Sequence, residues 1–137
     1  MLHKNSKIEL LKRVPLFAGC SKKELEHVAM VADEIDFRPG KSLIREGELG
    51  REFFILVDGT AEISRNGKPI DTAGPGDFFG EMALLADQPR NATVTTTSAV
   101  DALVVTARSF RDLIADNPLI ALKVMRAVAE RLPPTAF

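Results

Sequence analysis

Two side chains of opposite charge stand within a largely apolar stretch, FGEMALLADQPRNA, at residues 79–92. Gly80 has no side chain, so a ligand can approach its backbone closely, and Glu81 opens a run of residues that favour a short helix. The first turn of such a helix offers free N–H groups and the positive end of its dipole to an anion. Arg90, directly after Pro89, adds a full positive charge and paired donors that match phosphate oxygens. These residues predict a phosphate pocket.

Glu81 is an unusual neighbour for a phosphate, because a carboxylate repels an anion. Its presence is explained if it accepts hydrogen bonds from a sugar hydroxyl, so Glu81 and Arg90 together suit a phosphorylated ribose. Each also has an ordinary structural interpretation. A carboxylate at a helix N-terminus gains about 0.3 to 1 kcal/mol from the dipole, and Arg90 can pair on the surface with Asp87 for about 0 to 1 kcal/mol. The combination with Gly80 and the short helix favours the ligand site.

The elements that must position this stretch begin with helices over residues 7–32. Ser21 and Glu24 have the spacing of a capping box, in which each side chain binds the other's backbone N–H. Apolar residues at helical spacing follow, with an inward face made of Leu25, Val28, Ala29 and Ala32.

From residue 33 the pattern changes to alternating apolar and polar residues, which is typical of strands. Asn66-Gly67 is a hairpin signal, and a Thr- and Val-rich segment after residue 92 predicts two more strands before residue 106. Helical spacing returns over residues 107–132, where Asn117 caps one helix and Pro118 begins the next. We therefore expect a mainly β fold, a barrel or sandwich at about residues 33–106 with flanking helices, in a single domain over residues 1–137.

The composition excludes several classes of function. A formal net charge of -1 lacks the basic excess of nucleic-acid-binding proteins, so no direct nucleic-acid contact is expected. The single Cys20 favours a reducing compartment. Lys and Glu interrupt the apolar N-terminus, which is neither a signal peptide nor a membrane-inserting segment. We expect a cytoplasmic protein.

Enzymatic activity is not expected either. The β region contains no His, so it lacks the ligands of a metal-dependent cupin barrel. No Ser lies in a Gly-x-Ser-x-Gly turn. No metal or cofactor is expected.

The stretch at residues 79–92 resembles the phosphate-binding cassette of cyclic nucleotide-binding domains, the module of the catabolite activator protein and of protein kinase A regulatory subunits. A second segment, LIREGELGREFFILVDG at residues 43–59, resembles that family's glycine-bearing strand-turn-strand, and the order of helices, barrel and helices agrees from about residue 8 to 132. The resemblance implies a double-stranded β-helix, or jelly-roll, barrel. It also implies that the ligand is a cyclic nucleotide monophosphate.

The resemblance assigns roles within the cassette. The ligand-binding residues that it implies are Gly80, Glu81, Met82, Ala83, Arg90, Asn91 and Ala92. Glu81 would accept a hydrogen bond from the ribose 2'-hydroxyl, and Arg90 would pair with the exocyclic phosphate oxygens. The N–H groups of Ala83 and Asn91 would complete the phosphate cradle.

Gly80 would lie against the ribose and Ala92 would pack beneath the site. The resemblance favours cyclic AMP over cyclic GMP, but Asn91 stands where relatives carry Ala, Ser or Thr, so the identity of the base stays open.

The base and its cover are assigned to residues outside the cassette. Ile63, Phe79 and Val94 either line a base pocket or belong to the plain core. Arg131 and Arg126 on the last predicted helix would reach back to cover the purine, since family members use that helix as a lid and guanidinium groups stack on rings.

Three functional hypotheses follow. The first is a sensor whose C-terminal helices move about Asn117-Pro118 when a cyclic nucleotide binds. The second is a protein-interaction or dimerisation module that has kept the barrel without depending on nucleotide, because PLIALKVMRAVAERL at residues 118–132 is apolar enough to leave a stripe for a partner. In the third, the chain is a piece of a larger receptor and PPTAF begins a linker.

Overall fold

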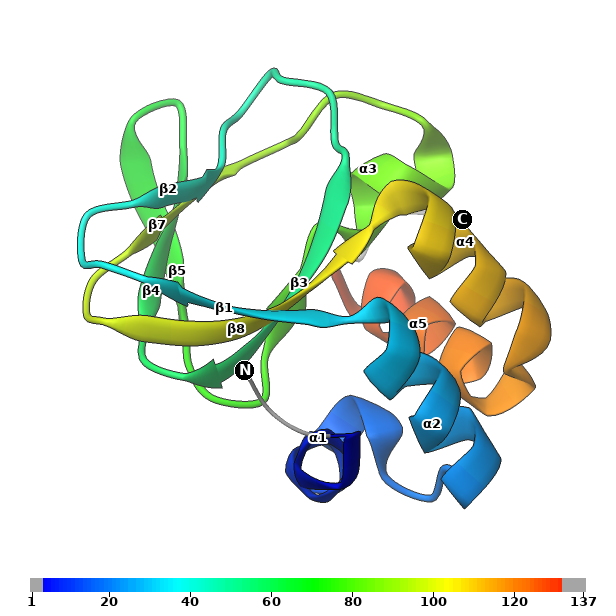
Figure 1. Ribbon diagram of the computed structural model, residues 1–137. Coiled ribbons are helices and arrows are strands. Elements are labelled where there is room, and N and C mark those ends of the chain that lie inside the picture. Colours follow the sequence, from blue (N-terminus) through cyan, green and yellow to red (C-terminus); the bar gives the residue numbers. More distant parts are fainter. Residues whose placement is uncertain (1–3, 132–137) are drawn as a thin grey trace.

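The structure is a computed structural model that describes residues 4–131, with only the backbone described for Lys4, Asn5, Met82 and Arg131. Two four-stranded antiparallel sheets form a barrel, and the helices gather on one side of it (Figure 1). The helices are α1 (Lys4–Leu11), the 3-10 helix η1 (Pro15–Phe17), α2 (Lys22–Val31), α3 (Glu81–Ala86), α4 (Ala107–Asp116) and α5 (Pro118–Arg131). The predicted fold class, mainly β with flanking helices, is confirmed.

Strands that are distant in sequence pair in both sheets. The first sheet has the order β1-β8-β3-β6, made of β1 (Asp33–Phe37), β8 (Val100–Thr106), β3 (Glu52–Asp58) and β6 (Phe78–Phe79). The second has the order β2-β7-β4-β5, made of β2 (Ser42–Ile44), β7 (Thr93–Thr96), β4 (Ala61–Arg65) and β5 (Lys68–Ala73). Each sheet therefore draws its neighbouring strands from both halves of the β region, as a jelly-roll barrel requires.

Local sequence signals act as predicted at two positions. The Ser21 Oγ accepts from the Glu24 N–H at 3.2 Å, and the Glu24 carboxylate accepts from the Ser21 N–H at 2.8 Å. This reciprocal capping box begins α2. Asn66 and Gly67 have φ angles of 53° and 77°. Two successive positive φ values suit the tight turn that joins β4 to β5.

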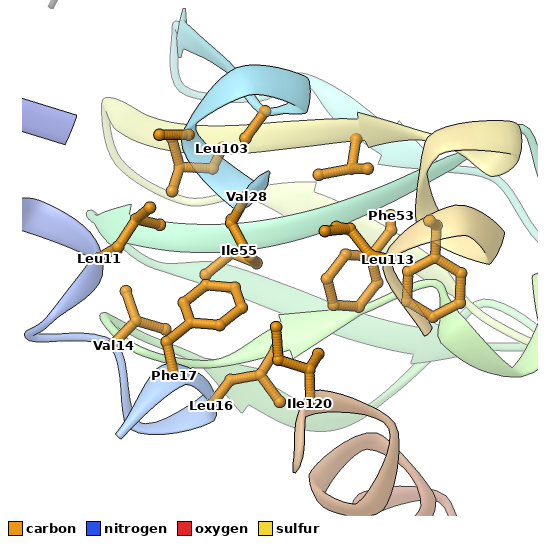
Figure 2. Close-up of a cluster of buried hydrophobic side chains, with 14 of the residues drawn as sticks. Leu11, Val14, Leu16, Phe17, Val28, Phe53, Ile55, Leu103, Leu113 and Ile120 are labelled. Atoms are coloured by element: carbon orange, nitrogen blue, oxygen red, sulfur yellow. The ribbon is translucent and has the colours of Figure 1, made fainter. Parts of the chain in front are cut away.

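The core explains why β3 is apolar on both faces. Phe53 and Ile55 pack with helical residues in a cluster between the first sheet and the helices, which Figure 2 shows. Phe54 and Leu56, pointing the other way, join a second cluster inside the barrel. Because both faces of β3 are buried, its sequence is a continuous apolar run instead of an alternating one.

The junction between the last two helices differs in detail from the expected cap. Pro118 begins α5 as predicted, and the Asn117 carbonyl accepts from the Ala121 N–H at 3.0 Å. The Asn117 side-chain nitrogen, however, donates to the Leu113 carbonyl at 2.9 Å and lies 3.1 Å from the His27 Nδ1. This side chain therefore closes the end of α4 and ties the junction to α2. Residue 132, the last of the predicted helix pair, lies outside the described residues.

Candidate functional site

Gly80 occupies a conformation and a space that only glycine fits. Its φ is +101°, in the left-handed region, and α3 begins directly after it. A Cβ at this position would lie 2.8 Å from the Arg90 Nη1 and 2.9 Å from the Glu52 carbonyl oxygen. The space beside Gly80 is therefore occupied by the arginine of the same stretch, and the close approach of a ligand to this glycine stays a prediction.

Arg90 is a buried residue of the pocket wall. It is 7% exposed, and its Nη1 donates to the Gly80 carbonyl at 2.8 Å. Its Nη2 donates to the Glu52 carbonyl at 2.6 Å. The side chain thus joins the start of α3 to β3, and the exposed pairing with Asp87 that the sequence left open is wrong.

The backbone around Arg90 is fixed to the loop between β2 and β3. The Arg90 N–H donates to the Glu48 carbonyl at 2.8 Å, and the Arg90 carbonyl accepts from the Gly47 N–H at 2.8 Å. Gly50 is packed so closely that a Cβ there would lie 2.9 Å from both the Ala83 Cβ and the Arg90 Cζ. The glycine-bearing segment at residues 43–59 therefore forms the support of the cassette.

Burial affects the electrostatics of Arg90. Removal from water lowers the pKa of its guanidinium, and the Glu52 carboxylate opposes this shift. The group stays protonated in a protein all the same. The site consequently keeps a permanent positive charge in partly desolvated surroundings, where attraction for an anion is stronger than in water.

Glu81, the first residue of α3, is fully buried at 0% exposure. A carboxylate that only complemented the dipole of a surface helix would stay in contact with water, whereas this one is enclosed in the wall of a pocket.

The pocket is a concave site of about 520 Å³, a volume in the range of small-molecule sites. It brings together six residues of the predicted cassette, namely Gly80, Glu81, Ala83, Arg90, Asn91 and Ala92. Ile63, Phe79 and Val94 line it as well, while Phe79 and Val94 also belong to the core cluster inside the barrel. The core interpretation therefore holds for Phe79 and Val94, Ile63 packs against the same cluster, and a base pocket stays a prediction.

Three predicted residues are not among those that the described pocket brings together. Met82 lies in α3 and Arg131 ends α5, but their side chains fall outside the described part of the chain. Arg126 is exposed on α5 and is not among the residues that line the pocket.

Several polar lining residues were not singled out from the sequence. They are Arg65, Asp71, Thr72, Asp77 and Glu130. The alternation of β4 contained a signal for Arg65, because residues two apart on a strand share a face and Ile63 was already assigned to the pocket. Glu130 had no such signal, since only the packing of α5 brings its end to the pocket.

The profile of the Cyclic nucleotide-binding domain family matches residues 34–117, more than half of the chain. The chain belongs to the cyclic nucleotide-binding domain family. Its β barrel, its cassette and its flanking helices all fall within or beside the matched residues.

Individual relatives agree with this assignment. The domain is 30% identical to the CRP-like cAMP-activated global transcriptional regulator of Mycobacterium tuberculosis, over 93% of this chain and 59% of that protein. It is 35% identical to a cGMP-dependent protein kinase of Toxoplasma gondii, over 85% of this chain and 12% of that protein. A solved structure of cAMP-bound PfPKA-R is 31% identical with a TM-score of 0.84, over 93% of this chain and 44% of that one. The chain thus spans between about a tenth and three fifths of these relatives.

The described residues contain neither a membrane-spanning helix nor a cluster of metal ligands. Within residues 4–131, no helix is long and apolar enough to cross a membrane. In the same part of the chain, no group of three or more His, Cys, Asp or Glu side chains is arranged to hold a metal ion.

Proposed function

We propose that this cyclic nucleotide-binding domain is a regulatory sensor that binds a cyclic nucleotide monophosphate without turning it over. The observation that carries the proposal is the convergence of a buried carboxylate, Glu81, and a buried guanidinium, Arg90, on one pocket with the start of α3. An acceptor and a cation in the same pocket suit the two polar parts of a cyclic ribose phosphate.

Each polar group has a specific role in the proposed complex. Glu81 accepts from the ribose 2'-hydroxyl, and the N–H groups of Ala83 and Asn91 donate to the phosphate. Arg90 supplies positive charge while two of its donors hold the Gly80 and Glu52 carbonyls. Gly80 lies against the ribose, and Ala92, which is buried, supports the site from beneath.

Cyclic AMP is the favoured ligand. The mycobacterial relative is named as cAMP-activated and the PfPKA-R structure contains cAMP, whereas the Toxoplasma kinase is named for cGMP. Because Asn91 differs from the residues that relatives carry at this position, the preference between cyclic AMP and cyclic GMP has to be measured.

The ligand acts by shifting the position of α5. This helix begins at the Asn117-Pro118 junction, and Glu130 near its end lines the pocket, so an occupied pocket changes the surroundings of the helix. Binding can shift a conformation only if the two positions of the helix differ in affinity for the ligand. Reduced hydrogen exchange of α5 in the presence of cyclic AMP would support this movement, and unchanged exchange would contradict it.

Isothermal titration of the ligand-free protein tests the proposal. Cyclic AMP is expected to bind, cyclic GMP to bind more weakly, and linear AMP to bind least, because its dianionic open phosphate does not match the cyclic ester. The absence of heat and of any thermal stabilisation with either cyclic nucleotide at millimolar concentration would refute the proposal.

The second candidate, a dimerisation or docking module, is favoured by a specific feature of α5. Leu122 and Met125, one turn apart, are 42% and 63% exposed. Sedimentation measurements of the ligand-free protein and of Met125→Lys discriminate this candidate. A dimer that the substitution dissociates, with or without nucleotide, would favour it over the sensor.

The domain organisation and the cellular location of the chain are also proposed. We infer a single domain over residues 1–137, with the barrel at about residues 33–106, located in the cytoplasm. A larger receptor that contains this chain is compatible with the lengths of the relatives.

A further inference from the structure

Arg65 lines the pocket beside Asn91, outside the cassette. It is the last residue of β4, where Ile63 pairs with Val94 and Ser64 pairs with Thr93 of β7. Ile63 lines the pocket, and residues two apart on a strand share a face. Arg65 accordingly lines the pocket too, beside the end of the cassette.

One hydrogen bond fixes the side chain of Arg65. Its Nε donates to the Asn91 carbonyl at 2.8 Å, which holds the guanidinium next to the residue whose N–H is assigned to the phosphate. The Nε carries one of the five donors of a guanidinium, and the two terminal nitrogens carry the other four. Arg65 is exposed, whereas Arg90 is buried and has both terminal nitrogens bound to carbonyls.

The charges of the lining residues favour a second cation at the site. Among the side chains that the structure describes, the pocket is lined by the four carboxylates of Asp71, Asp77, Glu81 and Glu130 and by the guanidinium groups of Arg65 and Arg90. An anionic ligand that enters the pocket is repelled by these acidic groups, and the positive charge of Arg65 offsets part of that repulsion.

We propose that Arg65 is a second phosphate-binding residue, which contacts the cyclic phosphate through its terminal nitrogens while its Nε holds the cassette at Asn91. The inference rests on the proposed binding of a cyclic nucleotide. A guanidinium at residue 65 favours anionic ligands, so affinity for the ligand depends on the charge of this side chain and on the salt concentration.

Titration of cyclic AMP into the wild-type chain and three variants at several salt concentrations tests the inference. Arg65→Gln removes the charge and Arg65→Lys keeps it. Lys68→Gln is the control, because Lys68 is exposed and pairs with Arg65 across the hairpin but does not line the pocket.

Arg65→Gln is expected to weaken binding about tenfold at low salt, as for loss of one hydrogen-bonded charge. The loss shrinks with added salt, because screening weakens the interaction between an exposed cation and the ligand. Arg65→Lys should recover most of the affinity, and Lys68→Gln should bind as the wild type does.

Three outcomes would overturn the inference. Wild-type affinity in Arg65→Gln removes Arg65 from the site. A loss that is equal at all salt concentrations and is not recovered by lysine assigns Arg65 a structural role at Asn91 alone. If Arg65→Gln and Lys68→Gln lose equal affinity for cyclic AMP, the effect comes from the overall positive charge of the protein and not from a contact of Arg65 with the phosphate. If the wild-type chain binds no cyclic nucleotide, the proposed function fails together with this inference, which distinguishes that case from the other three.

Discussion

Arg90 combines a structural role with the binding role that we propose for it. Its two terminal nitrogens join the carbonyls of Gly80 and Glu52, which lie on different elements, and its charge faces the pocket. The same bonds keep the guanidinium oriented before any ligand arrives. Preorganisation of this kind lowers the cost of binding, because the side chain has no rotamer freedom left to lose.

Arg90→Ala is therefore expected to change two quantities. Affinity for cyclic AMP should fall by about 2 to 5 kcal/mol, as for loss of a desolvated charge partner. The free energy of unfolding should fall by about 1 to 3 kcal/mol, because two partly buried carbonyls lose their donors. Titration calorimetry and urea unfolding measure the two losses.

The matched control for this prediction is Arg126→Ala. This arginine is exposed on α5 and does not line the pocket, so both quantities should stay near their wild-type values. Wild-type affinity in Arg90→Ala would remove Arg90 from the binding site, and wild-type stability would show that its carbonyl contacts are energetically unimportant.

For single residues, the sequence was sufficient to identify the charged side chains of the site but not the groups that they contact. Glu81 and Arg90 were found because their types and spacing are unusual in an apolar stretch. Glu52 contributes a backbone carbonyl, which every residue type possesses, so nothing in its identity reveals the contact. The alternation of β4 puts Arg65 on the face of Ile63, but its position beside Asn91 depends on the pairing of β4 with β7, which local sequence does not specify.

Among the elements, α5 is attached to the N-terminal helices by polar contacts as well as by apolar packing. The Lys123 Nζ donates to the Pro15 carbonyl at 3.3 Å and to the Ala18 carbonyl, both at the 3-10 helix η1. Nearer its start, Asn117 contacts His27 of α2. The Lys123 contacts connect the proposed moving helix to a segment more than a hundred residues earlier in the chain, and the Asn117 contact spans 90 residues.

Lys123→Met tests how far this attachment restrains α5. Methionine keeps much of the side-chain stem but cannot donate to the two carbonyls, so local opening of α5 in the ligand-free protein should become easier by about 1 kcal/mol, or about fivefold in hydrogen exchange. Exchange measured by mass spectrometry over residues 118–131 provides the readout.

Arg126→Met provides the comparison for Lys123→Met, because it makes the same kind of change at an exposed position of the same helix. It should leave the exchange of α5 unaltered. Equal exchange in Lys123→Met and the wild type would mean that apolar packing alone, through residues such as Ile120 and Val124, holds the helix.

Elements whose signals are local were predictable, whereas their arrangement was not. A capping box needs only Ser21 and Glu24, three residues apart, and a tight turn needs only the adjacent Asn66 and Gly67, so both are visible in the local sequence. The position of β8 between β1 and β3 depends on contacts across more than forty residues of sequence, which no local pattern encodes. The resemblance of two motifs to a known family supplied that part of the prediction.

Across the whole molecule, charge is distributed unevenly although the formal net charge is only -1. Strand pairing places Asp101 of β8 opposite Asp36 of β1 and Asp58 of β3, and Glu34 is close enough to share a hydrogen bond with it. The pKa of Asp101 is raised from 3.8 to about 7, mainly by burial and further by the hydrogen bond with Glu34 and the neighbouring negative charges. The folded protein therefore binds a proton here that the unfolded chain releases near pH 4.

This raised pKa predicts that stability falls with increasing pH. The contribution of Asp101 is fully present below about pH 4, where the carboxyl is protonated in both states, and is lost as the pH rises through about 7. Because Asp101 is only partly buried, solvent screening limits the loss to on the order of 1 kcal/mol.

Asp101→Asn stays neutral at every pH, so it should melt at a higher temperature than the wild type at pH 8 and at nearly the same temperature at pH 4. Asp112→Asn, at an exposed position on α4, removes one carboxylate elsewhere and should follow the wild-type pH dependence. Parallel curves for Asp101→Asn and the wild type from pH 4 to 8 would show that the acidic group at the junction of β1, β8 and β3 imposes no cost on the folded state.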